Sequence, residues 1–184
     1  MGLRQIRKRL REERKNMLRR FRKEKRQNLL ANPGEHEYII VLDHLKPDFN
    51  IGKIFRSADA FAAREVHLIG TDFFSPVPAM GSFKWVPARF HETFDTCYEE
   101  LIESDYTLFT MEPSADETIL SVSLPERSAF IFGNEGLGIS FDKAEYNGIR
   151  SLKIPQLGKV ESLNVSIAAS IVMYEYVRQH GKSV

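Results

Sequence analysis

Apolar residues near the start of the chain recur every three, four or seven positions, which is the spacing of one helix face. Arg, Lys and Glu, which favour helices, fill most of the positions between them. Asn32-Pro33-Gly34 then ends the pattern, because proline cannot continue a helix and glycine favours a turn. We therefore predict a helix over residues 1–30, with an apolar face formed by Leu3, Ile6, Leu10, Met17 and Phe21.

After this break, apolar runs alternate with stretches of helical period. The apolar runs predict strands over residues 38–43, 65–69, 106–111, 129–132 and 152–154. The other stretches predict helices over residues 50–63, 94–104, 140–146 and 163–180. Because strands that alternate with helices form parallel sheets, residues 31–184 are predicted to form one α/β domain, a mainly parallel sheet flanked by helices.

The net charge of +1 conceals a strong asymmetry along the chain. Residues 1–30 hold 13 Lys and Arg against three Asp and Glu, a net charge of +10, so the other residues carry −9. A basic segment on an acidic body is typical of a protein that binds a polyanion. Two other interpretations of this segment are a solvated helix packed on the body or a second subunit, and a helix on a membrane surface. Its apolar face is thin and lacks Trp, which disfavours the membrane.

The composition also limits the expected cellular location and the kinds of disulfide and metal site that the chain can form. No apolar run is long enough to span a bilayer, and the charged N-terminus lacks the apolar core of a signal peptide. We therefore expect a cytoplasmic protein without a membrane partner. Cys97 is the single cysteine, which excludes an internal disulfide and a zinc site built from cysteines. The five histidines show no metal-ligand spacing, so no metal site is predicted.

Three segments place polar or glycine residues where predicted strands end, the edge at which open α/β sheets bind ligands. Residues 50–57, Asn-Ile-Gly-Lys-Ile-Phe-Arg-Ser, begin a helix. Asn50, Lys53 and Ser57 lie near one face of that helix with Arg56 beside them. A helix start with an arginine in its second turn suits an RNA phosphate or a polarised hydroxyl. The alternative is an Asn50 cap with a surface arginine.

The second segment is Phe-Gly-Asn-Glu-Gly-Leu-Gly at residues 132–138. Three glycines in six residues indicate a loop whose backbone passes close to another group, or a tight turn before the helix expected at Ser140. The spacing is not that of the dinucleotide fingerprint. In the third segment, residues 154–166, a Pro/Gly loop leads to a helix for which Ser162 is a plausible N-cap. A cap does not explain why Glu161, Ser162, Asn164 and Ser166 cluster.

Together these segments resemble the three motifs of the SpoU/TrmH family in the SPOUT superfamily of RNA 2'-O-ribose methyltransferases. The first is similar to that family's Asn-x-Gly-x-x-x-Arg-Ser/Thr, the second to its Phe-Gly-x-Glu-x-x-Gly loop. The third is similar to its Ile-Pro-x-x-Gly-x-x-x-Ser-Leu-Asn-Val-Ser segment. Order and spacing agree across residues 38–176. Residues 82–86, Ser-Phe-Lys-Trp-Val, resemble a stretch of the tRNA-modifying branch, whereas residues 1–30 lie outside the resemblance.

The resemblance implies a C-terminal trefoil knot, a homodimer with its site near the subunit interface, and S-adenosylmethionine as the methyl donor. It implies that Arg56 activates the ribose 2'-hydroxyl. A guanidinium stays protonated, so we favour a cationic clamp over a base and leave the proton acceptor open. The other residues given catalytic roles are Asn50, Glu135, Ser162 and Asn164. The residues expected to hold or close over the cofactor are Thr110, Met111, Glu112, Gly133, Asn134, Gly136, Ile154, Pro155, Leu157 and Leu163.

The expected reaction is methyl transfer to a ribose 2'-hydroxyl of RNA. The short chain and the Lys84-Trp85 stretch favour tRNA over ribosomal RNA as the substrate. A non-catalytic RNA-binding protein of the same fold is the rival from another functional class. The presence of all five catalytic positions argues against it. Residues 1–30 are then expected to form an RNA-binding extension of the methyltransferase domain.

Overall fold

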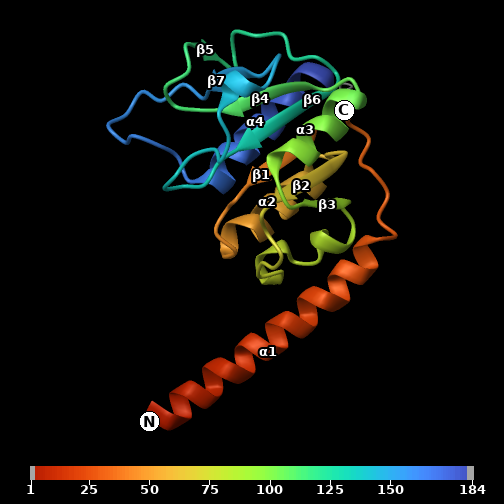
Figure 1. The fold of residues 1–184 in the computed structure, drawn as a ribbon, viewed down its shortest axis with the longest axis vertical. Coiled ribbons are helices and arrows are strands. Elements are labelled where there is room, and N and C mark those ends of the chain that lie inside the picture. The colour runs from red at the N-terminus through yellow and green to blue at the C-terminus, as the bar shows by residue number, and fades with distance from the viewer. Residues whose placement is uncertain (1–2, 182–184) are drawn as a thin grey trace.

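Seven strands form one parallel sheet in the order β3-β2-β1-β6-β4-β7-β5 in the computed structural model, which describes residues 3–181 (Figure 1). Helices pack on both faces of this sheet, which confirms the predicted α/β class. The strands are β1 (Ile39–Asp43), β2 (Glu65–Ile69), β3 (Ala88–His91), β4 (Thr107–Met111), β5 (Glu117–Thr118), β6 (Ser128–Phe132) and β7 (Arg150–Lys153).

Four α-helices and three short 3-10 helices occur within residues 3–181. The α-helices are α1 (Leu3–Asn28), α2 (Phe49–Ala60), α3 (Phe94–Glu103) and α4 (Val165–His180). The 3-10 helices are η1 (Val77–Ala79), η2 (Ser82–Lys84) and η3 (Lys143–Glu145). None of these helices is long and apolar enough to cross a membrane.

Residues of β1 alternate between two hydrophobic cores, one on each face of the sheet, because successive side chains of a strand point to opposite faces. Ile40 and Leu42 belong to the core shared with α2 and α4. Ile39 and Val41 belong to the core shared with α3. All five residues of β1 are buried, so the strand is apolar almost throughout, as expected of a central parallel strand.

The order in which the chain adds strands to the sheet reverses next to β1, and this reversal brings the functional segments to one edge. From β1 it passes through α2 to β2 on one side, whereas β6 and β4 lie on the other side. The loops that follow β1, β6, β4 and β7 therefore open on the same edge. Ligands of open α/β sheets bind at such a reversal, beyond the carboxyl ends of the strands.

Some predicted elements differ from the structure. The helix expected over residues 140–146 is only η3, because buried Asp43 accepts hydrogen bonds from the backbone and hydroxyl of Ser140 and holds that segment as a loop. The helix expected to reach residue 63 ends at Ala60, since Ala62 has a φ of 48° that a right-handed helix does not allow. Strands β3 and β5, which lie at the edges of the sheet, were not predicted.

Helix α1 projects away from the body and contacts it only near its C-terminal end (Figure 1). Phe21 is buried and stacks on Phe83 at 5.6 Å between ring centroids. Asn28 donates from its side chain to the carbonyls of Phe83 and Val86 and accepts from the backbone of Ala88. The other end of the predicted apolar face does not pack on the body, because three of its members are exposed: Leu3, Ile6 and Leu10.

Candidate active site

Asn50 connects all three of the motif segments identified in the sequence. Its side-chain amide donates to Glu135 Oε1 at 2.8 Å, and its Oδ1 accepts from Asn164 Nδ2 at 3.3 Å. Asn50 lies in the first turn of α2, Glu135 lies in the loop after β6, and Asn164 precedes α4. Three segments that are far apart in the chain thus meet at the edge of the sheet where ligands are expected.

Neither Asn50, the alternative considered for α2, nor Ser162, the plausible cap considered for α4, is the N-cap of its helix. Asp48, rather than Asn50, is the N-cap of α2 and accepts from the Asn50 backbone. Asn164, rather than Ser162, caps α4 by accepting from the backbone of Ser166 at 3.0 Å. Because Asp48 takes the cap, the Asn50 side chain is available for Glu135. Asn164 uses its oxygen as the cap and its nitrogen for Asn50.

The glycine loop after β6 is fixed largely by its own hydrogen bonds. Asn134 and Gly138 exchange backbone hydrogen bonds of 2.7 and 2.9 Å. The Asn134 side chain accepts from the backbones of Gly136 and Leu137 and donates to the His44 carbonyl. Asn134 therefore holds the turn of the loop and ties it to the end of β1.

Gly133 is required by the loop itself. A Cβ built at Gly133 would lie 2.4 Å from the Gly138 carbonyl carbon and 2.5 Å from the Ile139 nitrogen. Real atoms never approach this closely without a shift of the backbone. The nearest obstruction to a side chain at Gly133 is therefore the loop's own backbone.

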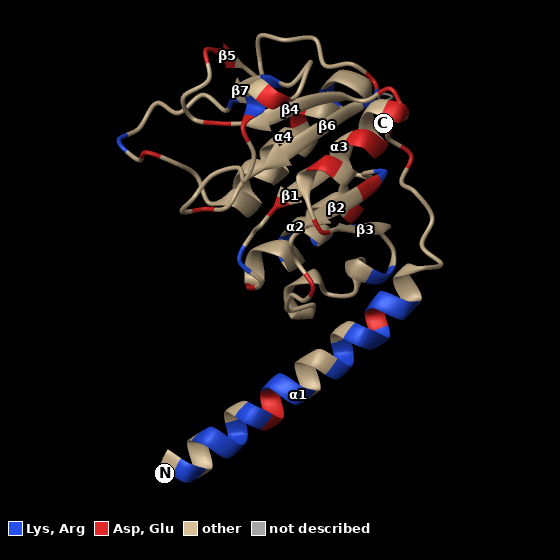
Figure 2. Ribbon diagram, in the orientation of Figure 1, with Lys and Arg blue, Asp and Glu red and all other residues tan. Residues whose placement is uncertain are grey.

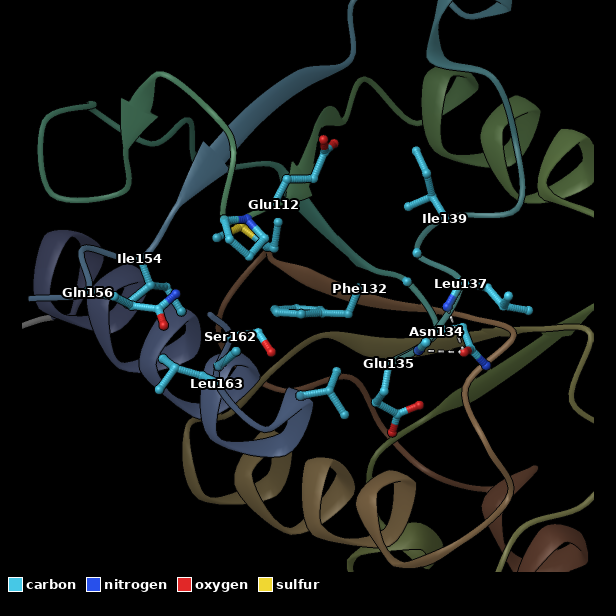
Figure 3. Close-up of a pocket in the computed structure, with 17 residues that line it drawn as sticks. Glu112, Phe132, Asn134, Glu135, Leu137, Ile139, Ile154, Gln156, Ser162 and Leu163 are labelled. Atoms are coloured by element: carbon cyan, nitrogen blue, oxygen red, sulfur yellow. Dashed lines mark hydrogen bonds between the residues drawn. The ribbon is translucent and has the colours of Figure 1, made fainter. Parts of the chain in front are cut away.

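A pocket of about 480 Å³ lies between the glycine loop, the end of β4 and the segment before α4 (Figure 3). This volume falls within the range of small-molecule sites in proteins. Seven of the ten residues predicted to hold or close over the cofactor line it: Met111, Glu112, Gly133, Asn134, Gly136, Ile154 and Leu163. Two residues with predicted catalytic roles, Glu135 and Ser162, also line it.

The remaining three predicted cofactor residues do not line this pocket. Thr110 is fully buried behind it, where its hydroxyl lies 3.0 Å from that of Ser151. Pro155 is exposed, and Leu157 is completely exposed, because the irregular segment after β7 points these two side chains outward. Gln156, between them, lines the pocket instead. Gln156 and the apolar wall residues Phe132, Ile139, Val165 and Ala168 are not among the ten cofactor residues named from the sequence.

Glu112 gives one wall of the pocket a negative charge. Partial burial alone would raise its pKa, but hydrogen bonds from Lys143, Thr110 and Ser151 and the charge of Lys143 lower the pKa below its usual value. The Lys143 ammonium lies 2.7 Å from Glu112 Oε1. Glu112 is therefore ionised at neutral pH and available to a positively charged or hydrogen-donating group.

The pocket suits a ligand that combines a flat apolar ring system with polar groups. Phe132, Leu163 and Ile154 give it apolar walls, and Glu112, Asn134 and Ser162 add polar atoms. Gln156 Oε1 is buried without a hydrogen-bond partner among residues 3–181. A buried acceptor of this kind is costly unless a ligand or water donates to it. The apolar walls and polar atoms of the pocket therefore fit a nucleoside-containing cofactor such as S-adenosylmethionine.

Arg56 lies outside the wall of this pocket. It is exposed on the second turn of α2, next to Ser57, whose hydroxyl lies 2.7 Å from that of Ser170 on α4. Asn50, Lys53 and Ser57, predicted to share one face of α2, therefore have different surroundings. Asn50 and Ser57 contact other segments, whereas Lys53 is exposed. The exposure of Arg56 leaves its guanidinium accessible to a macromolecule.

The chain is similar in sequence to known RNA methyltransferases. A profile of the SpoU rRNA Methylase family matches residues 37–174. The tRNA (guanosine(18)-2'-O)-methyltransferase of Thermus thermophilus is 31% identical over 149 residues, which are 78% of this chain and 76% of that protein. The 23S rRNA (guanosine-2'-O-)-methyltransferase RlmB of Neisseria meningitidis is 28% identical over 158 residues, which are 83% of this chain and 63% of that protein.

Solved structures show the same fold. The TrmH/SpoU tRNA modifying enzyme of A. aeolicus superposes with a TM-score of 0.72 at 24% identity, over 86% of this chain and 83% of that one. An AdoMet-bound rRNA methyltransferase from Sinorhizobium meliloti superposes with a TM-score of 0.66 at 26% identity, over 85% of this chain and 61% of that one. The matched region contains the three motif segments and the pocket that they line.

Proposed function

The chain belongs to the SpoU rRNA Methylase family, it is an S-adenosylmethionine-dependent RNA 2'-O-methyltransferase, and we propose that its substrate is a tRNA. The observation that carries this proposal is the convergence of Asn50, Glu135 and Asn164 beside the pocket. The match covers 76% of the tRNA-modifying relative but only 63% of the ribosomal RNA relative, which favours tRNA. Ribosomal RNA is the alternative substrate, and we place the activity in the cytoplasm.

We assign the cofactor to the pocket lined by the glycine loop and by Ile154, Gln156 and Leu163. Gln156 Oε1 would accept a hydrogen bond from the adenine amino group or a ribose hydroxyl. Apolar contacts from Leu163 and Ile154 would hold the ring. Glu112, whose Oε1 is paired with the Lys143 ammonium, would accept a hydrogen bond from the cofactor through its other carboxylate oxygen.

The cofactor supplies a methyl group on a sulfonium, whose leaving group is a neutral thioether. The enzyme's part is to hold the ribose oxygen in line and to stabilise the negative charge that develops on it. Arg56 would provide the opposing positive charge, because its guanidinium would bind the incipient alkoxide or the neighbouring phosphate. A guanidinium keeps its proton, so Arg56 does not act as a base and the proton of the 2'-hydroxyl passes to solvent water.

Asn50, Glu135 and Asn164 position these groups relative to one another. The Asn50–Glu135 hydrogen bond joins the helix that carries Arg56 to the loop that lines the pocket. The Asn50–Asn164 hydrogen bond joins the same helix to the start of α4. Through these two contacts the position of Arg56 is tied to the cofactor pocket. Ser162, which lines the pocket, would contact the ribose or the cofactor.

A homodimer would complete the site. Ile167 and Tyr174 on α4 are more than half exposed, and so are Leu137, Leu157 and Val160 near the pocket. Large apolar side chains gathered on one region of a surface are typical of an interface. A second copy covering α4 would bury them and bring further groups close to the pocket. We also place the trefoil knot in the chain between β6 and α4, whose segments line the pocket together.

Helix α1 forms an RNA-binding arm in this proposal. Lys and Arg residues occur along its whole length, whereas acidic residues are spread over the body (Figure 2). Because Leu3, Ile6 and Leu10 are exposed, packing on the body does not explain the first half of the helix. The body carries a net negative charge that opposes RNA binding, and the arm would outweigh it.

The test of the substrate is methyl transfer to purified RNA. The full chain is incubated with labelled S-adenosylmethionine and either total tRNA or ribosomal RNA from a strain that lacks the gene. Label in a 2'-O-methylated nucleoside of tRNA is the expected result. Incorporation into ribosomal RNA alone would replace tRNA by the alternative substrate, and incorporation into neither would contradict the activity.

A further inference from the structure

A second cluster of chemically active side chains lies on the opposite face of the sheet from α2 and α4, between β2, β3 and α3. His67 comes from β2, His91 from the end of β3, and Cys97 from α3. Their ligand atoms all lie within 4.8 Å of one another. The proposed methyl-transfer chemistry uses none of the three. The sequence showed no metal-ligand spacing because 24 residues separate the two histidines and only the parallel pairing of β2 with β3 brings them together.

The distances within the cluster match those of a tetrahedral zinc site. His91 Nε2 lies 3.1 Å from His67 Nδ1, and Cys97 Sγ lies 3.6 Å from the same nitrogen. Zn–N bonds of about 2.05 Å and a Zn–S bond of about 2.3 Å at tetrahedral angles place two nitrogens about 3.3 Å apart, and a nitrogen and a sulfur about 3.6 Å apart. The two distances from His67 Nδ1 therefore suit such a site, and His91 Nε2 and Cys97 Sγ lie within 4.8 Å of each other.

The other ring nitrogen of His67 has a partner that favours metal binding. Its Nε2 lies 3.3 Å from Glu65 Oε2, which also accepts from Arg89 Nε at 3.0 Å. A carboxylate can only accept, so Nε2 carries the proton and the lone pair on Nδ1 faces His91 and Cys97. Histidine ligands of metals commonly donate their second N–H to a carboxylate in this way.

Glu100 lies at the rim of the cluster, where its carboxylate groups with Glu65 and His67 rather than with Cys97. It follows Cys97 by three residues on α3, so the two side chains lie on the same face of that helix. Glu100 Oε2 is 4.0 Å from His91 Nε2, and its side chain is 42% exposed. An ion could therefore enter past Glu100, whereas His67 and Cys97 are buried.

From these observations we propose that His67, His91 and Cys97 form a zinc-binding site with a structural role, in which water or a shifted Glu100 provides the fourth ligand. The ion would join the edge strand β3 to α3 and β2. Strand β3 also supports α1, because Lys25 lies 3.6 Å from the ring centroid of Phe90 and Asn28 accepts from the backbone of Ala88. Bound zinc would thus fix the strand on which the base of α1 rests.

The competing account contains no ion. In it, His91 Nε2–H donates to His67 Nδ1 and Cys97 is a buried thiol in a hydrophobic core. That account predicts no stoichiometric binding of zinc by the chain. The two accounts therefore differ in a measurement that does not depend on methyltransferase activity.

The experiment uses the full chain, stripped of metal by a chelator and titrated with Zn²⁺ against a chromogenic competitor, and separately with Co²⁺. We expect one ion per chain, a rise in the thermal midpoint with zinc, and a thiolate-to-cobalt charge-transfer band. Cys97→Ser should abolish the band, and both Cys97→Ser and His91→Ala should weaken zinc binding by more than about 100-fold. Glu65→Gln should weaken it by about 10–100-fold, the usual effect of losing a partner of a metal-bound histidine.

His36→Gln is the matched control, because His36 packs against Tyr176 in the other core and lies outside the cluster. It should bind zinc as the unaltered chain does. Absence of one-to-one zinc binding by the unaltered, folded chain would overturn the proposal. Equal zinc affinity in the unaltered chain, Cys97→Ser and His91→Ala would also overturn it, since the ion would then be bound elsewhere.

Discussion

The amide of Asn50 donates a 2.8 Å hydrogen bond to Glu135, which lies 85 residues later in the chain. This contact joins α2, which carries exposed Arg56, to the glycine loop that lines the pocket. The RNA-facing charge and the cofactor-binding loop are thereby linked through one pair of side chains. The relationship explains why a helix that contributes no residue to the pocket wall can take part in the proposed reaction.

A double-mutant cycle on Asn50→Ala and Glu135→Ala should show strong coupling. Each change alone removes the same hydrogen bond, so the double variant should lose less than the sum of the two single losses in kcat/KM. Residues in direct contact typically couple by about 0.5–3 kcal/mol. Additive effects within about 0.3 kcal/mol would show that the contact has no part in the reaction.

Arg56→Ala should lower the rate of methyl transfer by about 10²–10³ while the affinity for S-adenosylmethionine stays unchanged. The reason is the loss of one positioned charge at the developing alkoxide, together with the position of Arg56 outside the pocket wall. Lys53→Ala, an exposed basic residue on the same helix, is the matched control for a general loss of charge. Single-turnover rates and calorimetric titration of the cofactor measure the two quantities, and near-normal turnover of Arg56→Ala would refute the assignment.

Gly133→Ala should weaken cofactor binding by about tenfold or more, equivalent to about 1.4 kcal/mol. The added methyl group would meet the backbone of Gly138 and Ile139 at about 2.5 Å, which forces the loop to move. Gly158→Ala, in the segment after β7, is the control, because a Cβ there would meet no atom within 4 Å and Gly158 does not line the pocket. Equal effects of the two substitutions on cofactor affinity would contradict this account of the loop.

The pairing of Glu112 with Lys143 should stabilise the fold in a pH-dependent manner. The pKa of Glu112 is lowered from 4.5 in the folded chain, so its stabilising effect is complete above that value and is lost as the pH falls through the lower, folded-state pKa. Glu112→Gln should therefore be less stable than the unaltered chain at pH 7, with a difference that shrinks below about pH 4.5. Denaturant unfolding at several pH values measures this difference, and a constant difference would argue against the ion pair.

Removing the first half of α1 should weaken RNA binding and flatten its salt dependence. Residues 3–16 contain seven of the thirteen basic residues of the segment and none of the residues that pack on the body, since Phe21 and Asn28 lie beyond them. If about five basic residues of the segment contact phosphates, the slope of log affinity against log salt concentration is about −4 for the full-length chain. The truncated chain should bind S-adenosylmethionine normally and show a shallower slope.

The alternative for α1 is that its exposed apolar residues contact a second subunit. Truncation would then lower the molecular mass measured by sedimentation and leave the salt slope per bound RNA unchanged. Deleting the whole of residues 1–30 is a less decisive experiment, because it also removes Phe21 from the core and the Asn28 hydrogen bonds to Phe83 and Val86. Equal salt slopes for the truncated and full-length chains would exclude the arm from RNA binding.

The central strands could be predicted from the sequence because burial on both faces gives them a continuous apolar pattern. The bounds of β2, Glu65–Ile69, agree with the prediction. The edge strand β3 was missed because its four residues are only partly buried or exposed and include Arg89 and His91. Strand β5 is two residues long, too short for any periodicity to reveal. The packing of Phe21 against Phe83 likewise depends on tertiary contacts between distant segments.

In the site, too, the residues within a motif could be predicted, whereas those positioned by irregular backbone or tertiary contacts could not. Motif spacing predicted Asn50, Glu135 and Asn164, and the structure brings these three together. In the irregular segment after β7 no period determines which side chain points inward, so Pro155 and Leu157 were chosen in place of Gln156. Asp43, whose buried carboxylate holds Ser140, was read only as the end of a strand, although a carboxylate after a buried apolar run was a usable signal.

The most direct test of the account is to identify the methylated nucleoside in tRNA. Purified tRNA from a strain without the gene is treated with the unaltered chain or with Arg56→Ala, digested to nucleosides and analysed by mass spectrometry. We expect a 2'-O-methylated nucleoside to appear with the unaltered chain and to fall by about 10²–10³ in initial rate with Arg56→Ala. Methylation on a base, or equal rates for the two proteins, would contradict it.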